Sequence, residues 1–270
     1  MNHLLRSKAP ITEEAWAEID AEARRSLVNY LAARRIIDFT GPHGWQMSAI
    51  TNGRVSPART LQDGTVQARL REVKPLLELR TPFTLRRDEL EAVARGACDP
   101  DLQPVIDAAR RAAAAEDRAV FHGLPDAGIV GITDASPHPK VTISDDYGRY
   151  PAHVAQAINL MREAGVEGPW ALALGPRCYA GVMQESEPGG YPVLKHLRLI
   201  LEEGKVVFAP AIDGAVVLSE RGGDFELVCG QDLSVGYLSH DAESVELYLE
   251  ETIATRVCSP EAAVHLAYAD

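Results

Sequence analysis

The side chains best suited to acid–base chemistry in this sequence are four pairs of adjacent carboxylates, at Glu116-Asp117, Asp145-Asp146, Glu202-Glu203 and Glu250-Glu251. Two carboxyl groups that share a proton can serve as the acid and the base of one reaction. Adjacent residues of a helix or strand point in different directions, however, so these pairs need not share a proton. We therefore expect them to lie on the solvated surface.

Histidine and cysteine, the usual ligands of transition metals, are scattered along the chain. The eight histidines, at positions 3, 43, 122, 138, 153, 196, 240 and 265, never lie four residues apart, the spacing that places two ligands on one helix face. The four cysteines, at positions 98, 178, 229 and 258, contain no CxxC pair. We expect no metal site, and we expect the cysteines to be reduced and buried.

No sequence signature of a catalytic or nucleotide-binding site is present. The chain lacks GxxxxGKS/T, GxGxxG after a strand, HExxH and GxSxG. A Ser-His-Asp triad can assemble from distant positions, but nothing in the sequence marks a nucleophile. The residues alone indicate an acidic α/β protein without a visible active site.

One acidic segment lies between two predicted helices and contains Glu185, Ser186, Glu187, Pro188, Gly189, Gly190 and Tyr191. The glycines and the proline favour a turn. The simplest interpretation is a flexible surface loop. Repeated around a symmetry axis, the same loop would form an acidic ring.

The elements that position these residues begin with a helix of about 22 residues after Thr12, which can cap it. Its apolar stripe contains Trp16, Ile19, Ala23, Leu27 and Leu31. Such a stripe usually packs into a core, and the alternative is a docking groove for another chain.

A long polar arm follows at residues 51–66, and Pro75–Leu85 has strand composition with two prolines, which favours an edge or a bend. An arm of this length without its own core is often used to bind a partner.

Helices are predicted at 88–95 and 100–121, and 134–140 is a boundary. Beyond it we predict strands at 141–143, 170–174, 205–208 and 215–218, helices at 151–164, 176–185 and 192–202, and a mostly β tail at 224–257.

Composition limits the classes of protein to consider. The chain has 270 residues, of which 46% are hydrophobic, and 27 Lys and Arg against 39 Asp and Glu give a net charge of −12. This charge disfavours nucleic acid and anionic lipid as partners. No apolar run of membrane-spanning length and no signal peptide is visible, so a cytoplasmic location is expected.

Several segments, taken in order, resemble the family one encapsulin shell proteins, also described as linocin-like bacteriocins. The segments that carry the resemblance are Leu5–Pro10 with Trp16 and Ile19-Asp20, Arg34–Asp38, Gly41–Trp45, Glu78–Leu85, Ala115–Gly123, Ser219–Leu227 and Gly230–Tyr237. Each is weak by itself, but their order and spacing together are highly specific.

The resemblance implies an α+β fold of the tailed-phage major capsid type, with a P-domain that contains a spine helix, an A-domain and an extended E-loop. The implied ranges are 1–48 for the N-terminal helix region of the P-domain, 49–77 for the E-loop, 78–134 for the P-domain with the spine helix, 135–221 for the A-domain and 222–270 for the C-terminal P-domain strands.

The resemblance also implies a structural function rather than an enzymatic one. Copies would self-assemble into a hollow icosahedral shell of about 60 subunits, or a larger multiple, with no nucleic acid or membrane partner. This cytoplasmic nanocompartment would enclose a cargo enzyme through the cargo's C-terminal targeting peptide. The cargo would be a dye-decolorising peroxidase or a ferritin-like iron-storage protein, linking the shell to oxidative stress or iron storage.

Two sites follow from the resemblance. The targeting peptide would bind at Leu27, Leu31, Arg34, Asp38, Leu233 and Val235, with the apolar residues accepting leucine or isoleucine and with Arg34 and Asp38 fixing the orientation. The segment Glu185–Tyr191 would line the five-fold pore, where Glu185 and Glu187 would favour small cations such as iron.

Some relatives bind a flavin through a tryptophan that follows a Phe-Thr-Leu segment, but Arg86–Leu90 contains no aromatic residue here. We expect no cofactor, although a Tyr or Trp elsewhere could take that place.

Two other functions stay open at this point. A prophage major capsid protein would share the fold, and neighbouring terminase or portal genes would favour it. Some family members have been labelled bacteriocins or proteases, and a hydrolase would turn over substrate as a small oligomer, but no motif supports one.

Overall fold

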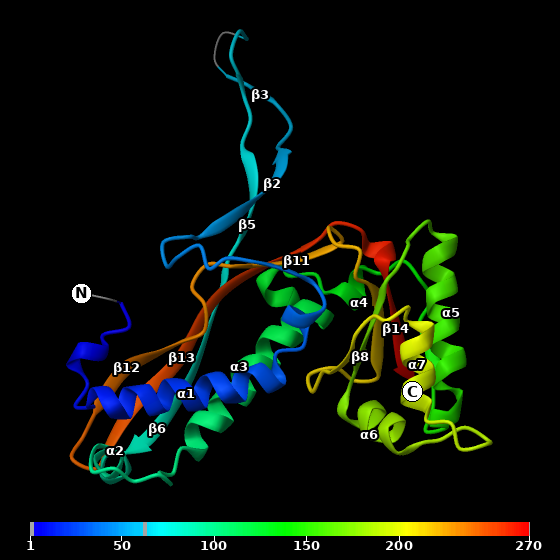
Figure 1. Ribbon diagram of the computed structural model, residues 1–270. Helices are drawn as coiled ribbons and strands as arrows, with labels where there is room; N and C mark the ends of the chain where they lie inside the picture. Colours follow the sequence, from blue (N-terminus) through cyan, green and yellow to red (C-terminus); the bar gives the residue numbers. More distant parts are fainter. Residues whose placement is uncertain (1–2, 62–63, 270) are drawn as a thin grey trace.

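The computed structural model describes residues 3–61 and 64–269, which form two bodies with an arm that projects from the first (Figure 1). The first body is a mixed five-stranded sheet in which β13 (Ser244–Val257) pairs on one side with β6 (Leu77–Arg86). On its other side β13 pairs successively with β12 (Ser234–His240) and β11 (Phe225–Cys229), and β1 (Asp38–Thr40) adds to β11.

Three helices pack against this sheet: α1 (Glu13–Tyr30), α2 (Arg87–Ala94) and α3 (Gln103–His122). The predicted cap of α1 is confirmed, since the Thr12 hydroxyl accepts a hydrogen bond from the Ala15 N–H. Trp16, Ile19 and Leu27 are buried against α3 and the sheet, so much of the α1 stripe belongs to the core.

The first helix is shorter than predicted. It ends at Tyr30, and a 3-10 turn follows at Ala33–Arg35. The cause is a carboxylate from α3: Asp117 accepts the backbone N–H groups of Ala32 and Ala33, both at 2.9 Å, which replaces the helical bonds these groups would otherwise make.

The second body is a five-stranded sheet in the order β7-β14-β10-β8-β9. Its strands are β7 (Val141–Ile143), β8 (Trp170–Leu174), β9 (Val206–Phe208), β10 (Ala215–Ser219) and β14 (Ala263–Tyr268). Around it lie α4 (Ile132–Ala135), α5 (Tyr150–Glu163), α6 (Pro176–Gln184) and α7 (Val193–Ile200), and further 3-10 turns occur at Arg6–Lys8, Pro125–Ala127, Tyr147–Arg149 and Pro260–Ala262. Strands β8 and β10 are buried throughout, because neighbouring strands flank them and helices cover the sheet.

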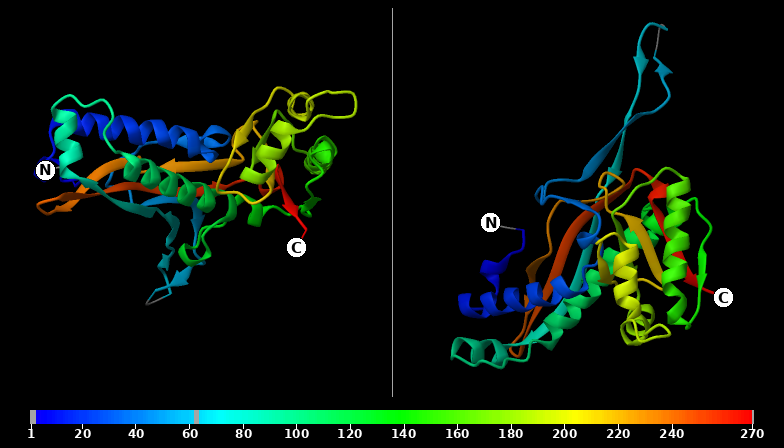
Figure 2. Two further views of the ribbon diagram at one scale, coloured as in Figure 1. Left: turned by 90° about the horizontal axis from the view of Figure 1, so that it is seen from below. Right: turned by 45° about the vertical axis from the view of Figure 1, so that its right-hand side comes forward.

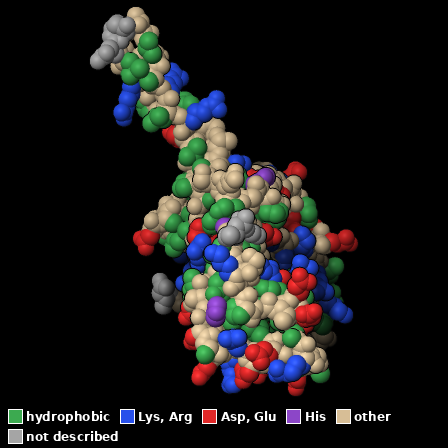
Figure 3. Space-filling view, turned by 90° about the vertical axis from the view of Figure 1, so that its left-hand side faces the viewer, with side chains coloured by type: hydrophobic (Ala, Val, Ile, Leu, Met, Phe, Trp, Pro, Cys, Tyr) green, Lys and Arg blue, Asp and Glu red, His purple; other side chains and the backbone are tan. Residues whose placement is uncertain are grey.

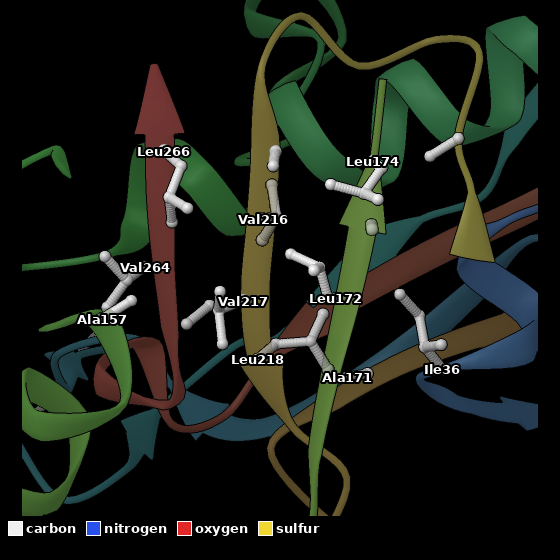
Figure 4. Packing of buried hydrophobic residues seen from close by; sticks show 14 of the residues in the cluster. Ile36, Ala157, Ala171, Leu172, Leu174, Val216, Val217, Leu218, Val264 and Leu266 are labelled. Carbon is white, nitrogen blue, oxygen red and sulfur yellow. The ribbon is translucent and has the colours of Figure 1, made fainter. Parts of the chain in front are cut away.

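Packing at the centre of this sheet follows the strand register (Figure 4). Val217 of β10 lies between its register partners, Leu172 on β8 and Val264 on β14. The last strand therefore completes the second sheet. The expectation that 222–270 forms P-domain strands is wrong for β14, because β14 pairs with β10 and β7 of the second sheet. Strand composition alone does not reveal which sheet a strand joins.

The arm is a long hairpin made of β2 (Ala49–Val55), β3 (Arg59–Thr60), β4 (Gln67–Ala68) and β5 (Arg71–Pro75). β2 pairs with β5 and β3 with β4, both antiparallel, and no other strand of the described residues joins them. The space-filling view shows the arm as a narrow projection with hydrophobic and basic side chains (Figure 3). Its exposed apolar residues are Val55, Leu61, Val66, Leu70 and Val73.

Two further expectations are tested by the fold. All four cysteines are free thiols, but Cys98 and Cys258 are exposed, so only half of them are buried as expected. None of the described helices combines the length and apolarity needed to cross a membrane.

Candidate functional site

A groove with a volume of about 380 Å³ opens between α1 and the start of β12. Apolar side chains from the chain start, the helix and the strands line it: Leu4, Ala23, Leu27, Val28, Leu31, Leu233, Val235 and Leu249. The polar lining consists of Arg6, Asp20, Arg24, Arg34, Asp232 and Ser234. The groove can thus accept a short segment with aliphatic side chains and polar or charged neighbours.

Five of the six residues predicted to bind the peptide meet in this groove, although about 200 positions of sequence separate α1 from β12. Leu27 and Val235 are buried and form the floor, whereas Leu31 and Leu233 are half-buried at the sides. The inner residues of the α1 stripe pack into the core as expected, and its C-terminal end lines the groove; the docking of another chain there stays a prediction.

Asp38 is the exception. It lies at the start of β1 and lines a separate, smaller polar pocket together with Lys205 and Glu220. Its carboxylate accepts the backbone N–H of Gly223 at 2.6 Å and so fixes the turn before β11. The expectation that Asp38 lines the groove beside Arg34 is wrong, because the 3-10 turn at Ala33–Arg35 redirects the chain between them.

The guanidinium of Arg34 donates hydrogen bonds to three carboxylates of the same chain. Its Nε lies 2.8 Å from Glu116 Oε2, its Nη1 lies 2.7 Å from Asp232 Oδ1, and its Nη2 lies 2.9 Å from Glu251 Oε2. A second bond from Nη2 reaches Glu116 at 2.5 Å, and the guanidinium carbon lies 4.6 Å from the centre of the Phe39 ring. Four of the five N–H groups of this guanidinium are therefore committed within the chain.

Glu116 and Glu251 are fully buried beside Arg34. Burial raises the pKa of Glu251 well above its usual value, and the neighbouring Glu116 adds to this effect against the opposing charge of Arg34. One guanidinium cannot neutralise three buried or half-buried carboxylates, and this favours the protonated form of Glu251.

These observations correct the expectation for two of the acidic pairs. Glu116-Asp117 and Glu250-Glu251 are buried, because each member pairs with a separate partner on its own side of the helix or strand. Asp117 caps the turn after α1, and burial raises its pKa to about 7. Glu250 accepts from Arg80 Nε at 2.5 Å, and His3 Nε2 lies 3.2 Å from its other oxygen.

The segment Glu185–Tyr191 forms a narrow loop that projects from the second body between α6 and α7 (Figure 2). Backbone bonds close it: Glu187 N–H donates to Tyr191 and Val193 N–H donates to Glu185. Glu185 is exposed, whereas Glu187 contacts His196 of α7, with 2.5 Å between Oε1 and Nδ1. The loop is therefore closed by its own backbone hydrogen bonds, and its two carboxylates have different surroundings.

Within residues 3–61 and 64–269, no cluster of three or more His, Cys, Asp or Glu side chains has the arrangement of a metal site. Sequence reasoning also missed the roles of Glu116, Asp232 and Glu251. Glu116 and Asp232 lie in segments that carry the resemblance, and this is the signal that could have pointed to them. The contacts of the three residues with Arg34 join positions 82, 198 and 217 residues apart.

Comparison with known proteins shows the family of this chain. Residues 1–254 match the family model described as "Encapsulating protein for peroxidase". A type 1 encapsulin shell protein from Rhodospirillum rubrum is 50% identical over 98% of this chain and 96% of its own length. Another from Mycobacterium tuberculosis is 43% identical over 99% of this chain and all of its own length.

Solved structures show the same fold at low sequence identity. The virus-like particle from Pyrococcus furiosus matches with a TM-score of 0.68 and 18% identity over 93% of this chain and 98% of that one. The capsid of the myovirus XM1 matches with a TM-score of 0.54 and 13% identity over 87% and 90% of the two chains. With its capsid-type fold and its full-length relatives, this chain belongs to the type 1 encapsulin shell proteins.

Proposed function

We propose that copies of this chain enclose a cargo enzyme inside the icosahedral shell that they build, and that they hold it through a peptide at the cargo's C-terminus. The shell itself follows from the family and the capsid-type fold. The observation that supports a cargo peptide is the groove beside α1, where apolar floor residues and charged rim residues from distant parts of the chain meet. The chain is the structural component, and catalysis belongs to the cargo.

The family description names peroxidase as the enclosed protein, and this supports a dye-decolorising peroxidase as the cargo here. A ferritin-like iron-storage protein is the other cargo expected. We place the compartment in the cytoplasm and assign no cofactor to the shell subunit. The fold also suits a phage capsid, but full-length identity of 43–50% with encapsulin shell proteins favours the compartment.

Expression of the chain alone tests the shell. Negative-stain images should show uniform hollow spheres, and sedimentation should give a particle of megadalton mass. A small oligomer under the same conditions would contradict self-assembly and reopen the search for enzymatic activity.

Co-expression tests the cargo groove. Targeting peptides of the encapsulin family are expected to have the form Leu/Ile-Gly-Ser/Thr-Leu. A fluorescent protein that ends in Leu-Gly-Ser-Leu should therefore copurify with the shells, and Leu31→Asp should abolish copurification by placing a charge beside the apolar floor. Leu199→Asp, at an exposed position of α7 in the second body and outside the groove, serves as the control. Equal loading of wild-type and Leu31→Asp shells would contradict the role of the groove.

We further propose that the loop Glu185–Tyr191 lines a pore at a symmetry axis, where repeated carboxylates attract small cations. Its projection from the second body supports this placement. Neutralising Glu185 and Glu187 to Gln should slow the uptake of ferrous iron into shells loaded with a ferritin-like cargo. Unchanged uptake kinetics would contradict the role of the two carboxylates.

A further inference from the structure

Most charged side chains of the groove already have partners. Arg6 lies 2.7 Å from Asp20, and its guanidinium carbon stacks 4.0 Å from the centre of the Trp16 ring. Asp232 is 2.7 Å from Arg34, which the buried glutamates hold from the other side. Neither arginine can turn toward a ligand without breaking an internal ion pair.

Arg24 is different. It lines the groove from α1, is exposed, and makes no hydrogen bond or ion pair with any other described residue. Its helical neighbour Arg25 is paired with Glu22 and lies outside the groove lining. Among the groove residues that the structure describes, Arg24 is thus the one cation without a compensating carboxylate.

We propose that Arg24 binds the terminal carboxylate of the cargo peptide while the peptide's aliphatic side chains fill the apolar floor. This inference rests on the proposed function of the groove and names the chemistry that selects the ligand. A peptide ending in Leu-Gly-Ser-Leu contains no acidic side chain, so its chain end supplies the only carboxylate. A guanidinium donates two parallel N–H bonds to a carboxylate, which fixes the direction of the bound peptide.

The expected effect is modest, because Arg24 is exposed and water screens the pair. Exposed ion pairs contribute little, so the loss of this one should weaken binding about two- to fivefold. The contribution should also fall with ionic strength, because salt screens exposed charges.

Fluorescence anisotropy with purified shells tests the inference. Two fluorescein-labelled peptides ending in Leu-Gly-Ser-Leu are compared, one with a free C-terminal carboxylate and one with an amide. Wild-type shells should bind the free acid more tightly than the amide. In Arg24→Gln shells the two peptides should bind equally, with the affinity of the wild type for the amide, and Arg25→Gln shells should behave as the wild type.

The outcomes separate this inference from the function on which it rests. If wild-type shells bind neither peptide, the proposed role of the groove fails. If they bind acid and amide equally well, or if Arg24→Gln retains the preference for the acid, the groove function stands and the role of Arg24 is refuted. Sedimentation of each variant as an intact shell confirms that the comparison is made on folded, assembled protein.

Discussion

At the scale of single residues, the most consequential contacts are those of Arg34. It joins α3, β13 and the loop before β12, because its guanidinium reaches Glu116, Glu251 and Asp232. The residue that was expected to orient a ligand is thus largely a structural element beneath the groove. Removing Arg34 would leave buried carboxylates without a counter-charge. The loss of stability would then exceed the net contribution that the ion pairs make to folding.

We therefore expect Arg34→Leu to lower the free energy of unfolding by about 3–5 kcal/mol, the usual cost of an orphaned buried charge. Glu251→Gln should change stability far less, because Gln resembles the protonated carboxyl group that burial favours at this position. Chemical denaturation of unassembled subunits, monitored by tryptophan fluorescence, measures both. Equal losses in the two variants would contradict the proposed charge state of Glu251.

The carboxyl group of Glu251 makes the stability of the fold depend on pH in a defined direction. Its pKa is raised in the folded chain, so between the ordinary value of 4.5 and the raised value the folded state binds more protons than the unfolded state. Its contribution to stability is therefore present at low pH and is lost as pH rises through the raised pKa. Glu251→Gln should remove this slope from the stability curve, and an unchanged slope would assign it to another group.

At the scale of elements, the two bodies meet where α3 ends beside β14. His122, the last residue of α3, and His265 of β14 have ring centres 5.8 Å apart. The Thr133 hydroxyl donates to the Phe121 carbonyl, so His122 Nδ1–H donates to Thr133. His265 Nε2–H points to the Asp213 carbonyl at 3.3 Å, and its Nδ1 is buried without a partner among the described residues. The buried Nδ1 of His265 has no described acceptor for a proton, so this arrangement favours the neutral form of that ring.

Burial lowers the pKa of both histidines. The positive charge of Arg118 also lowers the pKa of His122, and that of Lys140 lowers the pKa of His265. The negative charges of Asp134 and Asp213 raise the pKa of both rings and so oppose these effects. The unfolded chain takes up protons first, near pH 6.5, so the pair should destabilise the fold progressively as pH falls below that value. Replacing both with Gln should flatten the stability curve between pH 6.5 and 5. The exposed His43→Gln serves as the control and should leave the curve unchanged.

At the scale of the whole molecule, the arm differs from the bodies in charge as well as in shape. Residues 49–77 contain five Lys and Arg against two Asp and Glu, a net charge of +3, in a chain whose net charge is −12. The arm also exposes apolar side chains and strands that no other described strand covers. These features suit docking onto the acidic body of a second copy.

Leu70→Asp combined with Val73→Asp should prevent shell formation while the subunit stays folded, because neither side chain contributes to the clusters that form the cores. Sedimentation should show subunits or small oligomers, and far-ultraviolet circular dichroism should match the wild type. Intact shells from this variant would show that these apolar positions are not needed for assembly.

The charge of the arm should govern the rate of assembly. Arg59→Glu combined with Arg69→Glu should slow assembly in 50 mM NaCl, measured by light scattering, because steering between opposite charges is lost. The difference from the wild type should largely disappear in 1 M NaCl, where the screening length is about 3 Å. A defect that persists at high salt would indicate direct contacts rather than steering.

Local patterns in the sequence determined much of this protein. The apolar stripe and cap of α1, the buried strands β8 and β10, and the long arm follow from periodicity, propensity and turn residues, which act over a few positions. The order of the family segments determined the fold class. Only the tertiary structure decided which sheet β14 joins, where α1 ends, that Asp38 lies outside the groove and that two of the four acidic pairs are buried. Each of these depends on a partner far away in the sequence, and strand pairing and burial of charge are set by that partner rather than by the residue's neighbours along the chain.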